Sequence, residues 1–367
     1  MRALIVTLAV VGGLHVHLQT CDAQTATDLP AGKKLITLEG QLWNARWSQD
    51  GKTILTCTHR KTKDDKDDTS RRFKRVDLWD AATGKPGNSL GELEIPSYPF
   101  HYLSAAGVRL VISQGFFLRT GEMEVWDTKR ANLDHRISVE IRQRPMYCIS
   151  VSANGDLIAE VYGGPTFKTA GTAGTGGINI YEAATGKKVR TLREEGRVPQ
   201  RAIFTLDGKS VITRLAGDVV HLWDIKTGKV LHKAQAPVVI GSSEMMVSPD
   251  GKKLVIGAMK KEALQVWSIP ELKTLGTIPN PFETVMRVEF SPSGKRLLAT
   301  GYRQGILIGG ERKLGAMVWD VEKNKMLHDW NTTTFQCGFC GEGHLGVGEP
   351  HAIMCYPIGP VGKKAMP

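Results

Sequence analysis

One arrangement of apolar and polar positions recurs along the chain. The segment VVHLWDIKTGKVL (219–231) is an apolar run that ends in Trp-Asp, passes a polar Thr-Gly-Lys and becomes apolar again. Such a pattern predicts two antiparallel strands joined by a tight turn. Its aromatic landmark returns at spacings of 37 to 55 residues, in a weaker form at the last position: Trp79, Trp126, Tyr181, Trp223, Trp267, Trp319 and Tyr356. An aspartate follows four of them, as Asp80, Asp127, Asp224 and Asp320. This period predicts repeated units of four short strands.

A glycine turn lies upstream of six of these aromatic residues. The glycines are Gly51, Gly107, Gly155, Gly208, Gly251 and Gly294, in segments such as SPDGKKLVI. Asp-Gly or Asn-Gly between alternating apolar residues is a strong hairpin signal, because both central residues of that turn favour positive φ. Each unit is therefore predicted to run as strand a, glycine turn, strand b, loop, strand c with the aromatic residue, tight turn and strand d.

We interpret the Trp-Asp landmark as structural. A large aromatic side chain on strand c can fill the space between stacked units and bury on the order of 150–250 Å². The neighbouring aspartate suits a hydrogen bond at the strand end. A ligand-binding row of aromatic residues is the disfavoured alternative, because the aromatic residue recurs at the same place in every unit.

The units that carry both landmarks resemble the WD-repeat (β-transducin-type) family, and the resemblance covers residues 34–358. It implies a β-propeller that presents its loops to other proteins. The Gly-His dipeptide that usually precedes strand a in this family is missing from every unit. The chain is therefore identified as a divergent bacterial-type, exported member, with more distant similarity to quinoprotein-like propellers.

We predict an all-β fold, a seven-bladed β-propeller with four-stranded antiparallel blades. Six blades are assigned to residues 42–94, 100–142, 146–195, 201–236, 244–279 and 284–331. Residues 335–358 offer three more strands, and the orphan strand KLITLEG (34–40) offers the fourth. Pairing the N-terminal strand with the C-terminal blade closes the ring and removes exposed sheet edges. Residues 359–367 remain as a C-terminal tail.

Residues 1–24 are predicted to be a signal peptide. Arg2 precedes a twelve-residue apolar run, and small residues stand near Ala23. A membrane anchor is one alternative, but a spanning helix needs about 20 apolar residues. Lipid attachment at Cys21 is another, disfavoured by the threonine before it. The mature protein is expected in the periplasm, at the cell surface or outside the cell, with no transmembrane segment after signal removal.

Three predicted b-to-c connections are about ten residues longer than those of the compact units: 59–74, 163–177 and 303–315. Antiparallel pairing places all b-to-c connections at one end of the ring, and long loops on a rigid scaffold often carry function. Tolerated, solvated insertions are the alternative. The candidate interaction residues are Arg60, Lys63, Arg71, Arg72, Phe73, Phe167, Lys168, Arg303, Arg312 and Lys313.

The net charge of +11 attracts anionic partners through a salt-dependent field. An acidic protein or an anionic envelope polymer fits this charge, and solubility alone is the alternative. Nucleic acid is disfavoured by the expected export and by the lack of an aromatic-basic binding motif.

Cysteine chemistry is the remaining candidate. In an oxidising compartment Cys337 and Cys340 could form a disulfide, with unpaired thiols as the alternative. Together with His344 they are also weak candidates for zinc, so no metal is assigned and no cofactor is expected.

No nucleophile elbow, phosphate loop or HExxH motif is present in the sequence. We therefore predict a non-catalytic, monomeric propeller that acts as an exported scaffold and binds a protein partner or assembly through its long-loop face. One alternative is a propeller hydrolase or quinoprotein-like oxidoreductase with a channel site, for which Arg46, His101 and Arg287 are the candidates. Another is a cell-surface polysaccharide-binding module, for which the long loops offer Phe73 and Phe167.

Overall fold

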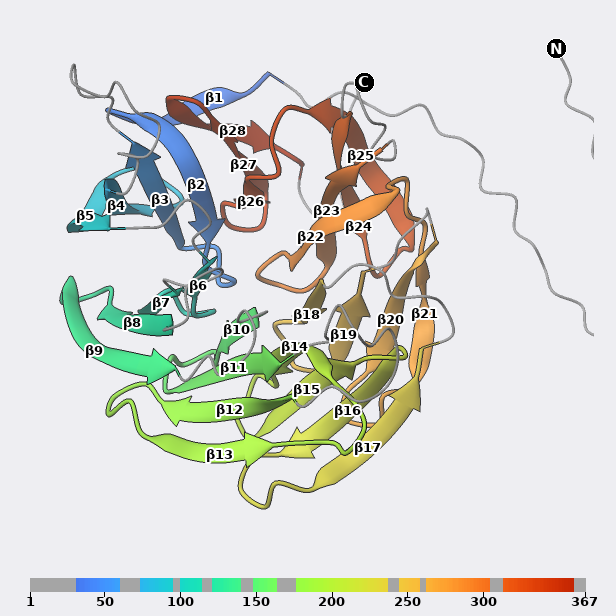
Figure 1. Ribbon diagram of the computed structural model, residues 1–367. Helices are drawn as coiled ribbons and strands as arrows, with labels where there is room; N and C mark the ends of the chain where they lie inside the picture. The colour runs from blue at the N-terminus through green and yellow to red at the C-terminus, as the bar shows by residue number, and fades with distance from the viewer. Residues whose placement is uncertain are drawn as a thin grey trace, which may run out of the picture.

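The chain forms a ring of seven four-stranded antiparallel sheets (Figure 1). The computed structural model describes residues 31–59, 73–94, 100–113, 121–139, 148–163, 176–236, 244–257, 262–303 and 313–359. Each sheet is a blade whose first strand lies near the axis of the ring and whose last strand lies outside (Figure 1). The predicted all-β, seven-bladed propeller is confirmed.

In six blades the strands pair in chain order from the inside outward. Blade 1 contains β2 (Gln41–Trp47), β3 (Thr53–His59), β4 (Phe73–Asp80) and β5 (Pro86–Glu94). Blade 2 contains β6 (Phe100–Leu103), β7 (Arg109–Ser113), β8 (Gly121–Asp127) and β9 (Asn132–Val139). Blade 3 contains β10 (Cys148–Val151), β11 (Leu157–Gly163), β12 (Gly176–Glu182) and β13 (Lys188–Leu192).

The second half of the ring follows the same order. Blade 4 contains β14 (Pro199–Phe204), β15 (Ser210–Leu215), β16 (Val219–Asp224) and β17 (Val230–Gln235). Blade 5 contains β18 (Met245–Val247), β19 (Lys253–Ile256), β20 (Leu264–Ser268) and β21 (Thr274–Ile278). Blade 6 contains β22 (Thr284–Phe290), β23 (Arg296–Tyr302), β24 (Leu314–Asp320) and β25 (Lys325–Thr332).

Blade 7 joins the two ends of the described chain. Its inner strands are β26 (Cys337–Phe339), β27 (His344–Glu349) and β28 (Ala352–Pro357), and its outermost strand is β1 (Lys33–Thr37). β1 pairs antiparallel with β28, with Lys33 opposite Cys355 and Thr37 opposite Ala352. The N-terminal strand therefore closes the ring, as the orphan strand in the sequence predicted.

The turns that end the innermost strands of blades 1, 4 and 5 share one hydrogen-bonding pattern. In blade 1, Ser48 Oγ donates to Asp50 Oδ1 at 2.6 Å and accepts the Thr53 N–H at 2.9 Å. Gly51 follows with φ +67°, a left-handed conformation that favours glycine. The same hydroxyl–carboxylate pair occurs in blade 4 between Thr205 and Asp207 at 2.7 Å. This network explains why Ser or Thr stands two positions before the acidic residue in these turns.

The hydrophobic core lies between the blades. Seven apolar clusters are found, each built from two neighbouring blades. The aromatic residue of the third strand always belongs to the cluster shared with the preceding blade; these residues are Trp79, Trp126, Tyr181, Trp223, Trp267, Trp319 and Tyr356 in the third strands of blades 1 to 7. Burying such a ring stabilises the contact between blades.

Polar partners fix many of these aromatic residues. Trp79 and Trp223 donate their Nε1–H to threonine hydroxyls on the neighbouring second strand, each at 2.8 Å. The aspartates after them cap the turn to the fourth strand: Asp80 Oδ1 accepts the Thr83 N–H at 2.8 Å, and Asp224 Oδ1 accepts the Thr227 N–H at 2.6 Å. In the structure the Trp-Asp pair thus acts on packing and turn geometry.

No helix among the described residues is long and apolar enough to cross a membrane.

Candidate functional site

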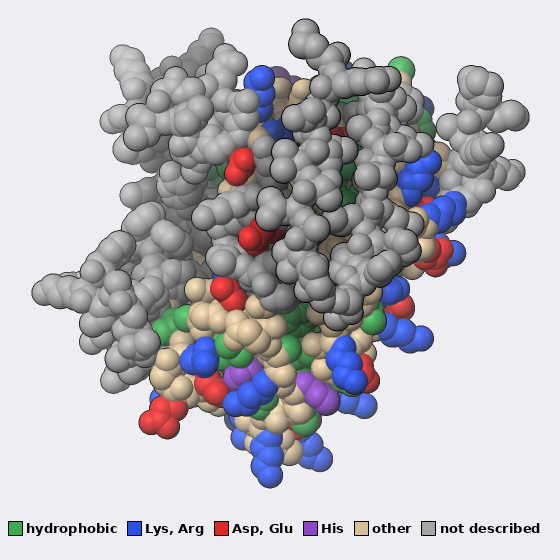
Figure 2. Space-filling model, turned by 90° about the vertical axis from the view of Figure 1, so that its right-hand side faces the viewer, with side chains coloured by type: hydrophobic (Ala, Val, Ile, Leu, Met, Phe, Trp, Pro, Cys, Tyr) green, Lys and Arg blue, Asp and Glu red, His purple; other side chains and the backbone are tan. Residues whose placement is uncertain are grey.

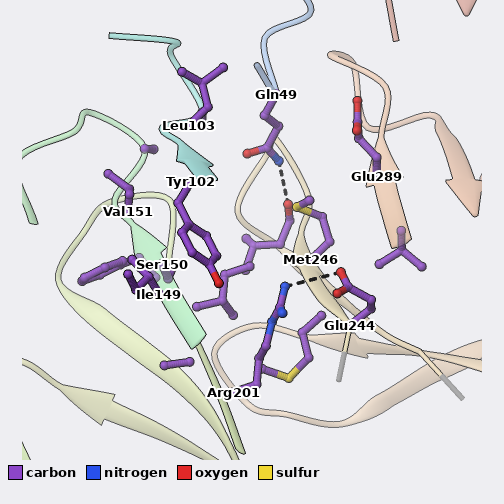
Figure 3. A pocket seen from close by; sticks show the side chains of 18 of the residues that line it. Gln49, Tyr102, Leu103, Ile149, Ser150, Val151, Arg201, Glu244, Met246 and Glu289 are labelled. Carbon is purple, nitrogen blue, oxygen red and sulfur yellow. Dashed lines mark hydrogen bonds and ion pairs between the residues drawn. The ribbon is translucent and has the colours of Figure 1, made fainter. Parts of the chain in front are cut away.

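The innermost strands carry two layers of side chains that line a cavity of about 190 Å³ (Figure 3). Because side chains alternate along a strand, residues two and four positions before the turn hydroxyl share a face. The first layer, two positions before it, consists of Arg46, Tyr102, Ser150, Ile203, Met246 and Glu289 from blades 1 to 6. The second layer, four positions before it, contributes Arg201, Glu244 and Arg287 from blades 4 to 6.

Two ion pairs lie in this cavity. Arg287 Nη2 is 2.7 Å from Glu289 Oε2, and both side chains are largely buried. Burial raises the pKa of Glu289, against the opposing effects of Arg287 and of the Phe339 N–H, which donates to Glu289 Oε1 at 3.1 Å. Arg201 Nη2 is 3.4 Å from Glu244 Oε2 (Figure 3). Each pair neutralises one guanidinium inside the ring.

Arg46 lies in the same cavity without such a partner. Within the described chain its guanidinium forms no hydrogen bond or ion pair, and its buried Nε atom has no acceptor. Burial, followed by the nearby Arg287, lowers the pKa of Arg46 to about 10. The side chain therefore remains protonated at neutral pH. Three guanidinium groups face two carboxylates, so one positive charge is uncompensated by the described lining.

Tyr102 and Gln49 add neutral hydrogen-bonding groups. The Tyr102 hydroxyl points into the cavity (Figure 3), and burial raises the pKa of this phenol, so it stays protonated. Gln49 Nε2 donates to the Val247 carbonyl at 2.7 Å, which joins blade 1 to blade 5 across the axis. The corresponding turn residues of blades 2 to 6 are apolar: Ala105, Ala153, Leu206, Pro249 and Pro292.

The charged lining of the cavity is suited to binding an anion. The side-chain hydroxyl groups of its lining belong to Tyr102, Ser150 and Thr205. No histidine is among the described residues that line it, so a nucleophile activated by an imidazole base is not assembled there.

The predicted channel residues are partly recovered. Arg46 and Arg287 line the cavity, whereas the side chain of His101 lies outside the description. Sequence reasoning missed Tyr102, Arg201, Glu244 and Glu289. Counting back two and four positions from the turn Ser or Thr would have placed all of them on one face.

Most of the predicted interaction residues fall outside the described residues. These are Arg60, Lys63, Arg71, Arg72, Phe167, Lys168, Arg312 and the side chain of Phe73. Arg303 is described and is anchored within blade 6: it pairs with Asp329 and donates to the Trp330 carbonyl at 2.9 Å. Lys313 is exposed. Figure 2 shows Lys and Arg side chains scattered over one side of the molecule among acidic ones, without forming one large basic patch there.

Of the two alternatives for Cys337 and Cys340, a disulfide or unpaired thiols, the structure has unpaired thiols. Cys337 packs in the cluster shared with blade 6, and Cys340 packs in the cluster shared with blade 1. Residues three apart on an extended chain point to opposite faces of the sheet. Cys340 lies beside Cys355 instead, and the two thiols share a hydrogen bond.

The weak zinc candidates do not converge either. Cys337 and Cys340 point to opposite faces, and His344 is exposed at the start of β27. In the part of the chain that the structure describes, no three His, Cys, Asp or Glu side chains are grouped so that they could hold a metal ion.

Comparison with known proteins places this ring among similar folds. No protein-family profile matches the chain. A curated relative, eukaryotic translation initiation factor 3 subunit I from Pyricularia oryzae, is 25% identical over 193 residues, 51% of each chain. The chain thus spans about half the length of that relative. The crystal structure of the Cps50 (Swd1) β-propeller domain from Myceliophteria thermophila superposes with a TM-score of 0.60 at 14% identity, over 87% of this chain and 98% of that one. Together with the geometry above, these likenesses support a WD-repeat-type β-propeller.

Proposed function

We propose that this chain is a non-catalytic, exported WD-repeat-type scaffold that binds a protein partner or assembly through the face carrying its long connections. The observation that carries the proposal is the topology of the ring. Because the first three strands of every blade pair antiparallel from the inside outward, the connections from second to third strand leave the ring at one end. The segments 60–72, 164–175 and 304–312, the longest of these connections, therefore start and finish on the same face.

The central cavity offers less support for an enzyme. Its charged side chains are paired arginines and glutamates plus one unpaired arginine, which suits binding. The curated relative is named as a subunit of a larger factor, and a scaffold role for this chain is of the same kind. Fold alone does not determine function, so the binding face has to be tested directly.

The test replaces segments 60–72, 164–175 and 304–312 with the short blade 4 connection Ala-Gly-Asp (216–218). Tagged wild type and variant are crosslinked in their native envelope, and the captured proteins are identified by mass spectrometry. We expect the variant to lose a specific protein that wild type captures. A matched control replaces Lys52, Lys209 and Lys252, which are exposed in turns on the opposite face, with serine. Equal capture by wild type and the shortened variant, or loss only in the control, contradicts the proposal.

Export is tested separately. The N-terminal sequence of the protein recovered from the envelope is expected to begin near residue 25, because residues 1–24 have the composition of a signal peptide. Recovery from the cytoplasm with Met1 intact contradicts this part of the proposal.

A further inference from the structure

We propose that the central cavity binds one small monocarboxylate, whose carboxylate pairs with Arg46. This site does not depend on the proposed scaffold role. The inference follows from three observations: an uncompensated guanidinium, a cavity of limited size, and a wall that combines polar and apolar side chains.

The first observation is the environment of Arg46. A buried charge is costly unless an opposite charge or hydrogen bonds compensate it. Arg201 and Arg287 have their own carboxylates, at 3.4 Å and 2.7 Å, and are thereby neutralised. The Nε atom of Arg46 has no acceptor in the described chain, and the repulsion that Arg46 feels from Arg287 is larger than the attraction it feels from Glu244. An anion beside Arg46 would remove both penalties.

The second observation is size. By the same measure of volume, one water needs about 10–15 Å³, so the cavity of about 190 Å³ holds on the order of a dozen water-sized groups. A drug-sized ligand or a nucleotide cofactor needs a pocket of roughly 300–1,000 Å³. The occupant is therefore a small molecule or the end of a longer one.

The third observation is the chemistry of the wall. One uncompensated positive charge matches one carboxylate better than a dianionic phosphate. Tyr102 places a polar hydroxyl group at the cavity, and its side chain points inward in Figure 3. Ile149, Val151 and Met246 line the same cavity and favour a short apolar substituent. Arginine is well suited to a carboxylate because its planar fork can donate two parallel hydrogen bonds.

Two sources could supply this group: a free small acid, or the C-terminal carboxylate of a peptide. The experiment measures binding to the purified protein by isothermal titration calorimetry, with butyrate and the isosteric neutral butyramide as probes. In parallel, an acetylated Leu-Val dipeptide acid is compared with its amide. Saturable binding of butyrate assigns the site to a free acid, and binding of the peptide acid at least tenfold tighter assigns it to a peptide terminus. Butyramide and the peptide amide are expected not to bind.

Substitution of Arg46 tests the residue itself. Arg46→Met is expected to weaken carboxylate binding at least tenfold, and Arg46→Lys, which keeps the charge, less. In buffer without carboxylates, Arg46→Met should melt above wild type, because it removes a partly buried charge whose Nε atom has no acceptor. Butyrate should then raise the melting temperature of wild type and leave that of Arg46→Met unchanged.

The proposal is overturned if neither acid binds, if acid and amide bind equally, or if Arg46→Met binds as wild type does. A lower melting temperature of Arg46→Met in carboxylate-free buffer would assign Arg46 a structural role instead. If Arg46→Met does not fold, the same comparison is made with Arg46→Lys, which must bind the acid more weakly than wild type.

Discussion

Glu342 is expected to hold blades 6 and 7 together through a turn that lacks its own acidic residue. In blade 5, Ser248 Oγ donates to Asp250 within the same turn. Blade 6 has Ser293 at the corresponding position, and Glu342 of blade 7 reaches across instead. Its carboxylate accepts Ser291 Oγ at 3.0 Å, the Ser293 N–H at 3.0 Å and Ser293 Oγ at 2.8 Å. Replacing Glu342 with alanine removes all three contacts.

The magnitude follows from these contacts and their exposure. A hydrogen bond to a charged group contributes about 1.5–3 kcal/mol where water is excluded. Glu342 is only partly buried, so in its absence water can form hydrogen bonds with Ser291 and Ser293. The free-energy contributions of hydrogen bonds that share one carboxylate are also not additive. We therefore expect Glu342→Ala to lower the free energy of unfolding by about 2 kcal/mol.

A double-mutant cycle in urea unfolding tests this reasoning. Ser293→Asp in the Glu342→Ala background should restore most of the lost stability, because it rebuilds the turn that blade 5 uses. In the wild-type background Ser293→Asp should destabilise, because two carboxylates then face each other. The control is Glu322→Ala, an exposed carboxylate 3.6 Å from Lys295 on the same blade, with an expected effect within about 0.5 kcal/mol. A Glu342→Ala effect as small as the control's, or no rescue by Ser293→Asp, refutes the interpretation.

Two further predictions follow from buried titratable groups. Burial raises the pKa of Glu160, although Tyr181 donates a hydrogen bond to its carboxylate at 2.8 Å. The folded state therefore binds the proton of Glu160 more tightly than the unfolded state does. The free energy of unfolding should fall as pH rises from the ordinary pKa of the carboxyl group through its raised value. The variant Glu160→Gln should lose that pH dependence and be more stable than wild type at neutral pH, which urea unfolding at several pH values measures. If the free energy of unfolding of the variant changes with pH as that of wild type does, Glu160 is not the group responsible. The hydrogen bond from Cys340, opposed by burial and assisted by Lys33, lowers the pKa of the Cys355 thiol to about 7. The rate at which iodoacetamide alkylates Cys355, followed by mass spectrometry, should rise with pH and level off above about pH 7. Cys340→Ala should move the midpoint of this rise to higher pH. An unchanged midpoint argues against an interaction between the two thiols.

The fold could be predicted from the sequence because its signals are local and repeated. The turn containing Gly51 and the aromatic residue Trp79 mark the same two places in blade 1 that Gly208 and Trp223 mark in blade 4. The glycine turn and the aromatic residue each depend on only a few neighbouring residues, and their recurrence in successive blades makes the pattern easier to recognise. The sequence also predicted the closing strand, because the apolar segment around Ile36 belongs to none of the first six blades and the C-terminal blade lacked a fourth strand.

The site was less predictable because it depends on contacts between distant blades. Arg46 and Arg287 could be identified from the sequence as charged residues on inner strands, but the sequence does not show that Glu289 forms its ion pair with Arg287. The sequence also does not show the partner of Cys340. Cys337 is only three residues away in the sequence, whereas Cys355 comes to lie beside Cys340 only when β28 folds back along the blade. Such pairings depend on which blades lie next to one another in the ring and on which face of the strand each side chain points to.

The isolation of Arg46 can be traced to the way the ring closes. In blade 7 the first-layer position is Gly338, and a Cβ atom there would lie 2.5 Å from the Trp47 ring. A Cβ atom at Gly346 would lie 2.7 Å from the same ring, so the ring of Trp47 lies against two glycines of the closing blade. The guanidinium group of Arg287 lies over the Trp47 ring, 5.8 Å from its centroid, and also forms the ion pair with Glu289. Blade 7 therefore receives a neighbour's indole where the other blades supply a lining side chain. No carboxylate enters the first layer from that side, and the charge of Arg46 is left for a ligand to compensate.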